Sequence, residues 1–184
     1  MASQQQVSNT PLPVRDSWQT PDWLFWWADQ RFDFDFDLAA DENNRKCNHF
    51  FSLESDALSQ EWFDYFPYGS TVQGWCNPPY SKPSLWLEKA WYEAEKGFRC
   101  VFLVPTPNGE NYWRDHVFGK ASEIIFINGR VAFELPNGDG TATPVTGNTR
   151  GSCLVIYNRR YEGHTQMSYV NRDDMIKEYK EAMK

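Results

Sequence analysis

The chain has 184 residues, 41% of them hydrophobic, and a formal net charge of -7, so it is long enough for one well-filled core and short for two. Its sequence pI of about 5.0 excludes the uniformly basic body of a non-specific nucleic-acid binder and leaves only a local basic face for such a partner. No apolar stretch approaches the roughly 20 residues that span a bilayer, and the amino terminus has no basic-then-apolar signal, so we expect a soluble, intracellular protein without a membrane partner.

Cysteine and histidine positions give little support to a metal site or a covalent nucleophile. The four cysteines lie far apart without zinc-like spacing, and we expect reduced, buried thiols. The three histidines have no neighbouring cluster of metal-ligating residues, and the chain lacks the Gly-x-Ser-x-Gly motif of an acyl nucleophile. The aromatic fraction of 17% fits stacking platforms or a bulky core, and packing is the expected role of most of these rings.

The first residues divide into a polar tail and a helix start. Residues 1–15 are polar and without periodicity, which predicts a flexible tail before a single domain over 16–184. Thr20 is then expected as the N-cap and Pro21 as the first helical position of a helix over 22–30. This pair either caps the helix or, alternatively, places the free amides of the helix start against a ligand carboxylate or ribose.

The segment 32–38 alternates aromatic or aliphatic residues with aspartate, which predicts a strand with its apolar residues on one face. Asp33 and Asp35 fit solvated or edge-protecting charges. Asp37 comes at the carboxyl end, just before two alanines, where ligands of α/β sheets bind, so we favour a functional role for it.

The next segments are shorter and less regular. Residues 41–48 are polar and turn-like, and residues 49–53 fit a second strand. Asp56 precedes a short helix and is either its N-cap or an acidic contact to a ligand. A further strand is expected over 71–76.

That strand leads into the corner Asn77-Pro78-Pro79-Tyr80. Two consecutive prolines end the strand ladder because neither can donate a backbone N–H. A residue before proline is held extended, which leaves the Asn77 amide and the Pro78 carbonyl free to face a ligand beside the Tyr80 ring. Two acceptors and a stacking face suit a planar group with an NH₂, such as a nucleobase extruded from a helix.

Strands and helices alternate after the corner. A helix is expected from a Ser81 cap, with Pro83 in its first turn, to Glu95. Alternation of this kind predicts an α/β fold with one doubly wound, mostly parallel sheet and a late antiparallel strand. The later strands are expected over 99–105, 122–128 and 152–157, and the later helices over 111–118 and 171–184.

A long polar excursion covers residues 129–151. It is rich in Gly, Asn, Thr and Pro, too polar for a core and too long for a tight turn. It is either a flexible insert or a substrate-facing insertion. Arg130 and Arg150 flank it, and we favour substrate contact because arginines that face phosphate are commonly presented from such loops.

Asp37 and Asn77 both end predicted strands. In an open α/β sheet the ligand crevice forms outside the carboxyl ends of the strands, where the strand order switches. If the two strands are neighbours across that point, a cofactor held by Asp37 meets a second substrate held by Asn77. The chemistry that fits is direct group transfer between two bound ligands.

From Trp18 to Tyr157 the sequence resembles the phage-type, Dam-like DNA N-6-adenine methyltransferases, which have a Rossmann-like methyltransferase fold and an Asp/Asn-Pro-Pro-Tyr motif. The resemblance covers most of the chain, and its ordered set of motifs is specific. It is carried by Trp18-Gln-Thr-Pro21, Asp37-Leu-Ala-Ala40, Asn44, Lys46-Cys47, Asp56-Ala-Leu58, Trp62, Trp75-Cys-Asn-Pro-Pro-Tyr80 and Gly129-Arg-Val-Ala-Phe133.

The resemblance implies methyl transfer from S-adenosylmethionine to adenine N6 in double-stranded DNA, with 16–184 as the methyltransferase domain. Asn77 and the Pro78 carbonyl would accept hydrogen bonds from the amino group of a flipped adenine, and Tyr80 would stack on it. Two aligned acceptors favour the positive charge that develops on that nitrogen, without a metal or a covalent nucleophile. The implied cofactor contacts are Thr20, Pro21, Asp37, Ala39 and Asp56, with Asp37 on the methionine amino group, and the expected DNA contacts are Lys82, Arg130 and Arg150.

One departure and three alternatives accompany this interpretation. The glycine-rich Phe-x-Gly-x-Gly cofactor loop of many methyltransferases is absent, and Asp37-Leu-Ala-Ala stands in its place. The same corner also serves enzymes that methylate an RNA base or a protein glutamine amide, and a non-enzymatic acidic protein that occupies another protein's DNA site needs neither cofactor nor Asn77. A phage enzyme of this kind would act in the cytoplasm of its bacterial host.

Overall fold

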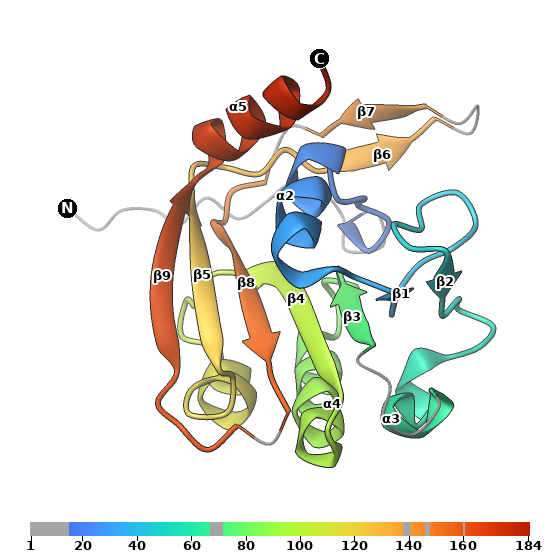
Figure 1. Ribbon diagram of the computed structural model, residues 1–184, viewed down its shortest axis with the longest axis vertical. Helices are drawn as coiled ribbons and strands as arrows, with labels where there is room; N and C mark the ends of the chain where they lie inside the picture. Colours follow the sequence, from blue (N-terminus) through green and yellow to red (C-terminus); the bar gives the residue numbers. More distant parts are fainter. Residues whose placement is uncertain (1–14, 67–71, 138–140, 146–147, 160) are drawn as a thin grey trace.

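Helices cover both faces of one large sheet in the computed structural model of this chain (Figure 1). The structure describes residues 15–66, 72–137, 141–145, 148–159 and 161–184. The expected flexible tail, residues 1–15, lies outside the described residues except for its last one, as does the first residue of the strand expected over 71–76.

Within those ranges the main sheet has seven strands in the order β2-β1-β3-β4-β8-β5-β9. β8 runs antiparallel to its neighbours β4 and β5, and the other neighbouring pairs are parallel. The predicted α/β class, with a mostly parallel sheet and a late antiparallel strand, is therefore confirmed. The strands are β1 (Phe36–Asp37), β2 (His49–Phe50), β3 (Gln73–Cys76), β4 (Arg99–Pro105), β5 (Glu123–Asn128), β8 (Ser152–Tyr157) and β9 (Gln166–Asn171).

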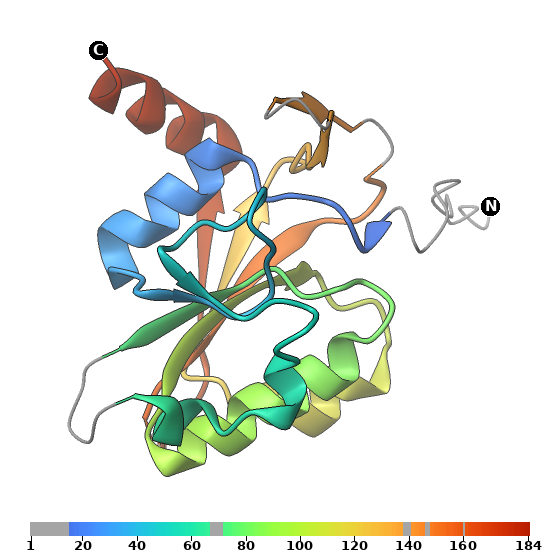
Figure 2. The ribbon, with the colours of Figure 1, turned by 90° about the vertical axis from the view of Figure 1, so that its right-hand side faces the viewer.

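The helices lie in two layers, one on each side of the sheet (Figure 2). One layer holds α2 (Asp22–Phe32) and α5 (Arg172–Ala182), which contact each other. The other holds α3 (Trp62–Tyr65), α4 (Pro83–Lys96) and a π-helical turn, Trp113–Val117. This arrangement on both faces is the doubly wound form that the alternation of strands and helices predicts.

The central strand β4 carries buried side chains on both faces. Cys100, Phe102 and Val104 join the core under α4, whereas Val101 and Leu103 join the core under α2. Alternate residues of a strand point to opposite faces, so a strand covered on both sides reads as one continuous apolar run. The bounds expected from that run, 99–105, are those of β4.

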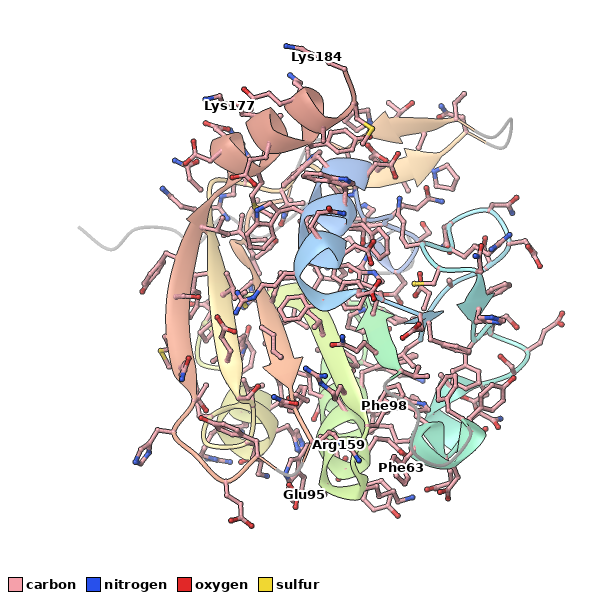
Figure 3. The ribbon with its side chains drawn as sticks, viewed as in Figure 1. Phe63, Glu95, Phe98, Arg159, Lys177 and Lys184 are labelled. Atoms are coloured by element: carbon pink, nitrogen blue, oxygen red, sulfur yellow. The ribbon has the colours of Figure 1, made fainter. Side chains whose placement is uncertain are left out.

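The two ends of the sheet differ in what gathers there. The parallel strands β3, β5 and β9 run toward the end of the sheet where α5 carries Lys177 and where the chain ends at Lys184 (Figures 1 and 3). Phe63 and Phe98 lie at the other end, beside α3 and α4 (Figure 3). There the buried Glu93 accepts the N–H of Phe63 at 3.0 Å and pairs with Lys89, which ties α3 to α4 far from the carboxyl ends of the strands.

The strand expected over 32–38 is wrong for most of its length. Helix α2 continues to Phe32, and Asp33 ends it in a left-handed conformation with φ 56°. Phe34 then donates its N–H to the carboxylate of Asp29 at 2.9 Å, so a side chain replaces a ladder partner. Only Phe36–Asp37 pairs as a strand, and the four apolar residues of the run divide between the two cores instead of sharing a face.

Both expected helix caps lie one residue too early. Pro21, and not Thr20, is the N-cap of α2, and it makes no side-chain capping hydrogen bond. Lys82, and not Ser81, is the N-cap of α4, and Pro83 lies in the first turn as expected, at its first position. Helix α4 ends within one residue of its expected end, because Gly97 caps it. Strand β8 has the expected bounds.

Three strands were missed. The edge strand β9 lies in a segment for which no strand was expected, and its six side chains are exposed or half-exposed. Within the excursion 129–151, β6 (Glu134–Pro136) and β7 (Ala142–Pro144) pair antiparallel as a small second sheet, where only irregular structure was expected. Residues 138–140 and 146–147 of this excursion lie outside the described part of the chain.

Candidate active site

The carboxyl ends of β1 and β3 lie side by side. Asp37 is opposite Trp75 in the parallel register, and Leu38 continues the pairing by donating its N–H to the Trp75 carbonyl at 2.8 Å. From β1 the chain turns to β2 on one side and later returns to β3 on the other, which makes this gap a point where the strand order switches. The expected neighbourhood of Asp37 and Asn77 is confirmed.

Two cavities open at this switch point and share Trp18 and Pro79 in their walls. The inner cavity, about 230 Å³, lies over the ends of β1 and β3 and includes Asp37 and Asn77 in its lining. The outer cavity, about 820 Å³, lies beyond the double-proline corner and includes Tyr80. One wall therefore separates a smaller space next to the sheet from a larger space next to the loops.

Asp37 is a buried carboxylate in the inner cavity, with 3% of its surface exposed. Its oxygens accept the backbone N–H groups of Ala39 at 3.2 Å and of Lys46 at 3.0 Å. Burial raises the pKa of Asp37 to about 6, while these two hydrogen bonds and the positive charge of Lys46 act in the opposite direction. The ammonium group of Lys46 itself pairs with Asp22 at 2.5 Å, and within the described ranges the Asp37 carboxylate forms no ion pair of its own.

Asn77 follows β3 directly and is held from one side only. Its side-chain Nδ2 donates to the backbone carbonyl of Trp18 at 2.9 Å. Its Oδ1 is buried and has no hydrogen-bond partner among the described residues. Buried polar atoms are paired in the great majority of cases, so an unpaired acceptor in a cavity wall points to a ligand that donates a hydrogen bond.

Tyr80 belongs to a cluster of three aromatic rings. Its ring meets Trp18 edge-on at 5.5 Å between centroids and meets Phe133 edge-on at 5.8 Å. Trp18 and Phe133 stack on each other at 5.4 Å. Burial raises the pKa of Tyr80, so the side chain stays a neutral phenol with its ring fixed in the wall of the outer cavity.

Asp56 also lines the inner cavity and has an unusual backbone. Its φ of 46° is left-handed, which is uncommon for a residue other than glycine and costs conformational energy. It precedes a 3₁₀ turn, Ala57–Ser59, yet its side chain makes no capping hydrogen bond. Asp56 is therefore the N-cap residue by position, which is one of its two expected roles, but its carboxylate takes no part in capping.

Basic residues gather around the outer cavity. Arg130 is exposed there, and Arg150 pairs with Glu110 at 2.6 Å and donates to the Thr106 carbonyl at 2.8 Å. Arg150 thus joins the loop after β4 to the loop before β8. Lys82 is exposed and lies outside the linings of both cavities.

The two cavities consequently carry opposite charge. The inner lining has four acidic side chains against one basic one, and the outer lining has three basic side chains against one acidic one. The acidic set is Asp16, Asp37, Asp41 and Asp56 with Lys46, and the basic set is Arg15, Arg130 and Arg150 with Glu110. The inner cavity therefore suits a cation and the outer cavity an anion.

Comparisons with known proteins identify the family. The family model described as DNA N-6-adenine-methyltransferase (Dam) matches residues 7–181. The chain belongs to this family. It is 32% identical over 178 residues to the DNA N-6-adenine-methyltransferase of Escherichia phage T1, covering 88% of this chain and 71% of that protein. It is 31% identical over 172 residues to the enzyme of the same name from Haemophilus phage HP1, covering 91% and 94%.

A shorter match joins these two. The putative methyltransferase YfdM of Escherichia coli K12 is 36% identical over 70 residues, which cover 36% of this chain and 74% of that protein. The predicted resemblance to phage-type adenine methyltransferases is therefore confirmed for the family, over most of the chain.

The structure gathers most of the residues that the sequence singled out in this family member. Thr20, Asp37, Ala39 and Asp56 line the inner cavity with Asn77, and Pro21 is outside both linings within the described ranges. The structure adds three residues to which the sequence assigned no role. Trp18, Arg15 and Glu110 line the cavities. Trp18 also contacts Asn77, and Glu110 contacts Arg150, and both are contacts between distant segments that no local pattern carries.

Other features of the chain bear on the chemistry. All four cysteines are buried and free, as expected. In the described part of the chain no three His, Cys, Asp or Glu side chains come together as a metal site would require. The helices described there include none that is long and apolar enough to cross a membrane.

Proposed function

We propose that this chain transfers a methyl group from S-adenosylmethionine to the N6 amino group of adenine in double-stranded DNA. Family membership and the two phage relatives support adenine-specific DNA methylation as the reaction. The observation that carries the proposal at the level of residues is the buried, unpaired Oδ1 of Asn77 in the region where the two cavities meet.

The adenine amino group, which accepts the methyl group, would bind at the corner Asn77-Pro78-Pro79-Tyr80. Adenine N6 shares its lone pair with the ring and is a weak nucleophile, and positive charge develops on it as the methyl group arrives. Asn77 Oδ1 and the Pro78 carbonyl would accept the two N–H groups of N6, which stabilises that charge in a site prepared beforehand. Both oxygens are neutral, so the corner orients the amino group and stabilises charge without acting as a strong base.

The side chains of the inner cavity suit the methyl donor. S-adenosylmethionine, when bound, supplies a methyl group on a positively charged sulfur and also carries a cationic amino group. The acidic surplus of this cavity and the buried Asp37 carboxylate suit those positive charges. Asp37 would hold the amino group, and Thr20, Ala39 and Asp56 would complete the wall around the remainder.

The outer cavity suits the DNA. A base inside a duplex is inaccessible, so enzymes of this kind act on a nucleotide that is turned out of the helix. Tyr80 would stack on the extruded adenine, and Arg130, Arg150 and Lys82 would face backbone phosphates. The shared wall then lies between a methyl donor on one side and an amino group on the other.

Expression of the protein in cells that lack adenine methylation tests the proposal, with modified bases mapped in the genomic DNA by long-read sequencing. We expect N6-methyladenine at a recurring sequence. The control is Asn77→Ala, which removes one of two acceptors and is expected to reduce turnover by about 100- to 1000-fold while cofactor binding by calorimetry persists. Unmodified DNA from a preparation that binds S-adenosylmethionine would contradict the proposed reaction.

A further inference from the structure

The segment 16–20, called the strap here, forms part of the wall between the two cavities. Asp16, Gln19 and Thr20 line the inner cavity, and Trp18 lines both. Trp18 is buried, with 5% of its surface exposed. The strap therefore lies where the methyl donor and the adenine of the proposed function would meet.

Three contacts fix the strap in place. The carboxylate of Asp16 accepts the backbone N–H of Ser81 at 2.9 Å, just beyond the double-proline corner. Gln19 and Glu134 exchange backbone hydrogen bonds at 2.8 Å and 3.0 Å, which joins the strap to the first residue of β6. Between these anchors the Trp18 carbonyl accepts a hydrogen bond from Nδ2 of Asn77. The strap is thus tied on one side to the corner and on the other to the small sheet.

The contact with Trp18 decides which way the Asn77 amide points. A carbonyl oxygen only accepts, so the NH₂ half of the amide must face Trp18. The oxygen half is left as the unpaired acceptor. A carboxylate at position 77 has no donor, and it would bring one anionic oxygen against the Trp18 carbonyl at the distance now bridged by a hydrogen bond.

We propose that the strap is a positioning element that orients the Asn77 amide and makes Asn, and not Asp, the residue this chain requires at position 77. The inference rests on the proposed function, because the family motif admits either residue and only turnover can distinguish them. Trp18 acts through its backbone carbonyl, and Asp16 acts by holding the strap against the corner at Ser81.

The first test compares Asn77→Asp with the wild-type protein in turnover of methyl groups into DNA at saturating cofactor. At pH 8 we expect Asn77→Asp to be about 10- to 100-fold slower, since a buried acceptor is left facing another acceptor. As the pH falls, the aspartic acid gains a proton that it can donate to Trp18, so the ratio to wild type should rise toward 1.

The ratio removes titration that both proteins share. The titratable and charged side chains that line the cavities around this position are Asp16, Asp37, Asp41, Asp56 and Lys46 in the inner one and Arg15, Tyr80, Glu110, Tyr112, Arg130 and Arg150 in the outer one. Full activity of Asn77→Asp at pH 8, or a defect that does not change with pH, would overturn the inference. An inactive wild-type protein would instead contradict the proposed function.

The second test uses the anchor at Asp16. Asp16→Asn keeps a side-chain oxygen that can accept from Ser81, whereas Asp16→Ala does not. We expect Asp16→Ala to lower kcat by about 3- to 10-fold with little change in KM for the cofactor or in Tm, and Asp16→Asn to restore kcat. Asp16→Asn that binds the cofactor more weakly would instead mark Asp16 as a charged cofactor contact. A lower Tm together with a lower kcat in Asp16→Ala would indicate a merely structural role. Either result overturns the role of Asp16 as an anchor.

Discussion

The inner and outer cavities share a wall and differ in almost every other respect. The inner cavity lies over strand ends inside a rigid sheet and is acidic, whereas the outer cavity is formed by loops and is basic. Ligands of opposite charge can therefore be held close to each other without either one entering the other's space. The comparison shows that the local charge of each cavity, and not the net charge of the chain, determines which ligand each cavity suits.

That arrangement explains how a chain with a net charge of -7 can serve a polyanionic substrate. Average charge governs long-range attraction, which screening limits to about 10 Å at moderate salt. Within that distance the phosphates of a DNA would meet Arg15, Arg130 and Arg150 before any carboxylate of the inner cavity. The separation is what the following predictions test, beginning with the largest expected effect.

Removing the buried charge of the inner cavity should weaken cofactor binding and leave DNA binding intact. We expect Asp37→Asn to raise the Kd for S-adenosylmethionine by about 10- to 100-fold, since hydrogen bonds to charged groups are worth about 1.5 to 3 kcal/mol. Calorimetry measures the Kd. Asp33→Asn is the matched control, because it removes one exposed aspartate at a left-handed position that asparagine tolerates. Equal effects of the two substitutions would argue against a specific role for Asp37.

The opposite result is expected in the outer cavity. Tyr80→Ala should lower kcat/KM for DNA. The loss of transition-state stabilisation calculated from the ratio to wild type should be about 1 to 3 kcal/mol, the usual range for stacking of a base on an aromatic ring. Cofactor affinity should stay near normal, because the ring lines the outer cavity. Tyr80→Phe keeps the ring and should retain most of the activity. Loss of cofactor binding in Tyr80→Ala would show that the two cavities are not independent.

pH provides a test that changes no residue. Because the pKa of Asp37 is raised to about 6, the carboxylate gains a proton as the pH falls through 6, and cofactor affinity should fall about tenfold between pH 7 and pH 5. Stability of the ligand-free protein should change in the opposite sense. The folded state holds that proton more tightly than the unfolded chain, so this group's contribution makes the protein more stable as the pH falls from 7 to 4. Both trends should be absent in Asp37→Asn, as titration calorimetry and thermal unfolding would show.

The smallest expected effect concerns single phosphate contacts. Arg130→Ala should weaken DNA binding and reduce the slope of log K against log salt by about 1, the value for one released counterion. Lys82→Ala should have a similar or weaker effect, because Lys82 lies outside both cavity linings. Arg150→Ala should differ in kind, since it breaks the pair with Glu110 and so changes turnover more than the salt slope. A salt slope unchanged in both Arg130→Ala and Lys82→Ala would place the DNA elsewhere.

The sequence predicts the long, fully buried strands well. β4 and β8 have bounds that agree with the apolar runs 99–105 and 152–157, because burial on both faces demands an unbroken hydrophobic stretch. The run 32–38 misleads for a physical reason. Alternation has a period of two, but helix α2 extends to Phe32 and Asp29 accepts the N–H of Phe34, so a local contact at the helix end overrules the pattern.

The edge strand β9 could not be predicted in the same way. It pairs with β5 on one side only, and its side chains are mostly exposed, so burial imposes no apolar pattern on it. Its Met167 and Tyr169 are exposed by 56% and 78%, where a buried strand would hide them. Edge strands of this kind are determined by a neighbour that only the folded chain supplies.

For the site, residue type at strand ends was informative and distant contacts were not. Asp37 and Asn77 could be placed at one switch point because both follow strands, which is a local property. The Trp18 carbonyl that holds Asn77 comes from 59 residues away along the chain, and a backbone atom leaves no trace in residue identity. The Arg150–Glu110 pair cannot be read from the sequence either, because a charged side chain is equally suited to solvent.

Gly74 sets the spacing of this site from below. It lies opposite Phe36 in the register between β1 and β3, and a Cβ there would come within 2.9 Å of both Leu38 and Phe98. A single added methyl group would therefore press against the Leu38 and Phe98 side chains beneath the strands that lead to Asp37 and Asn77, although it touches neither of these two residues. Gly74 thus leaves room for apolar side chains directly under the site, so we expect Gly74→Ala to slow methyl transfer with every polar group of the site intact, as single-turnover rates would reveal.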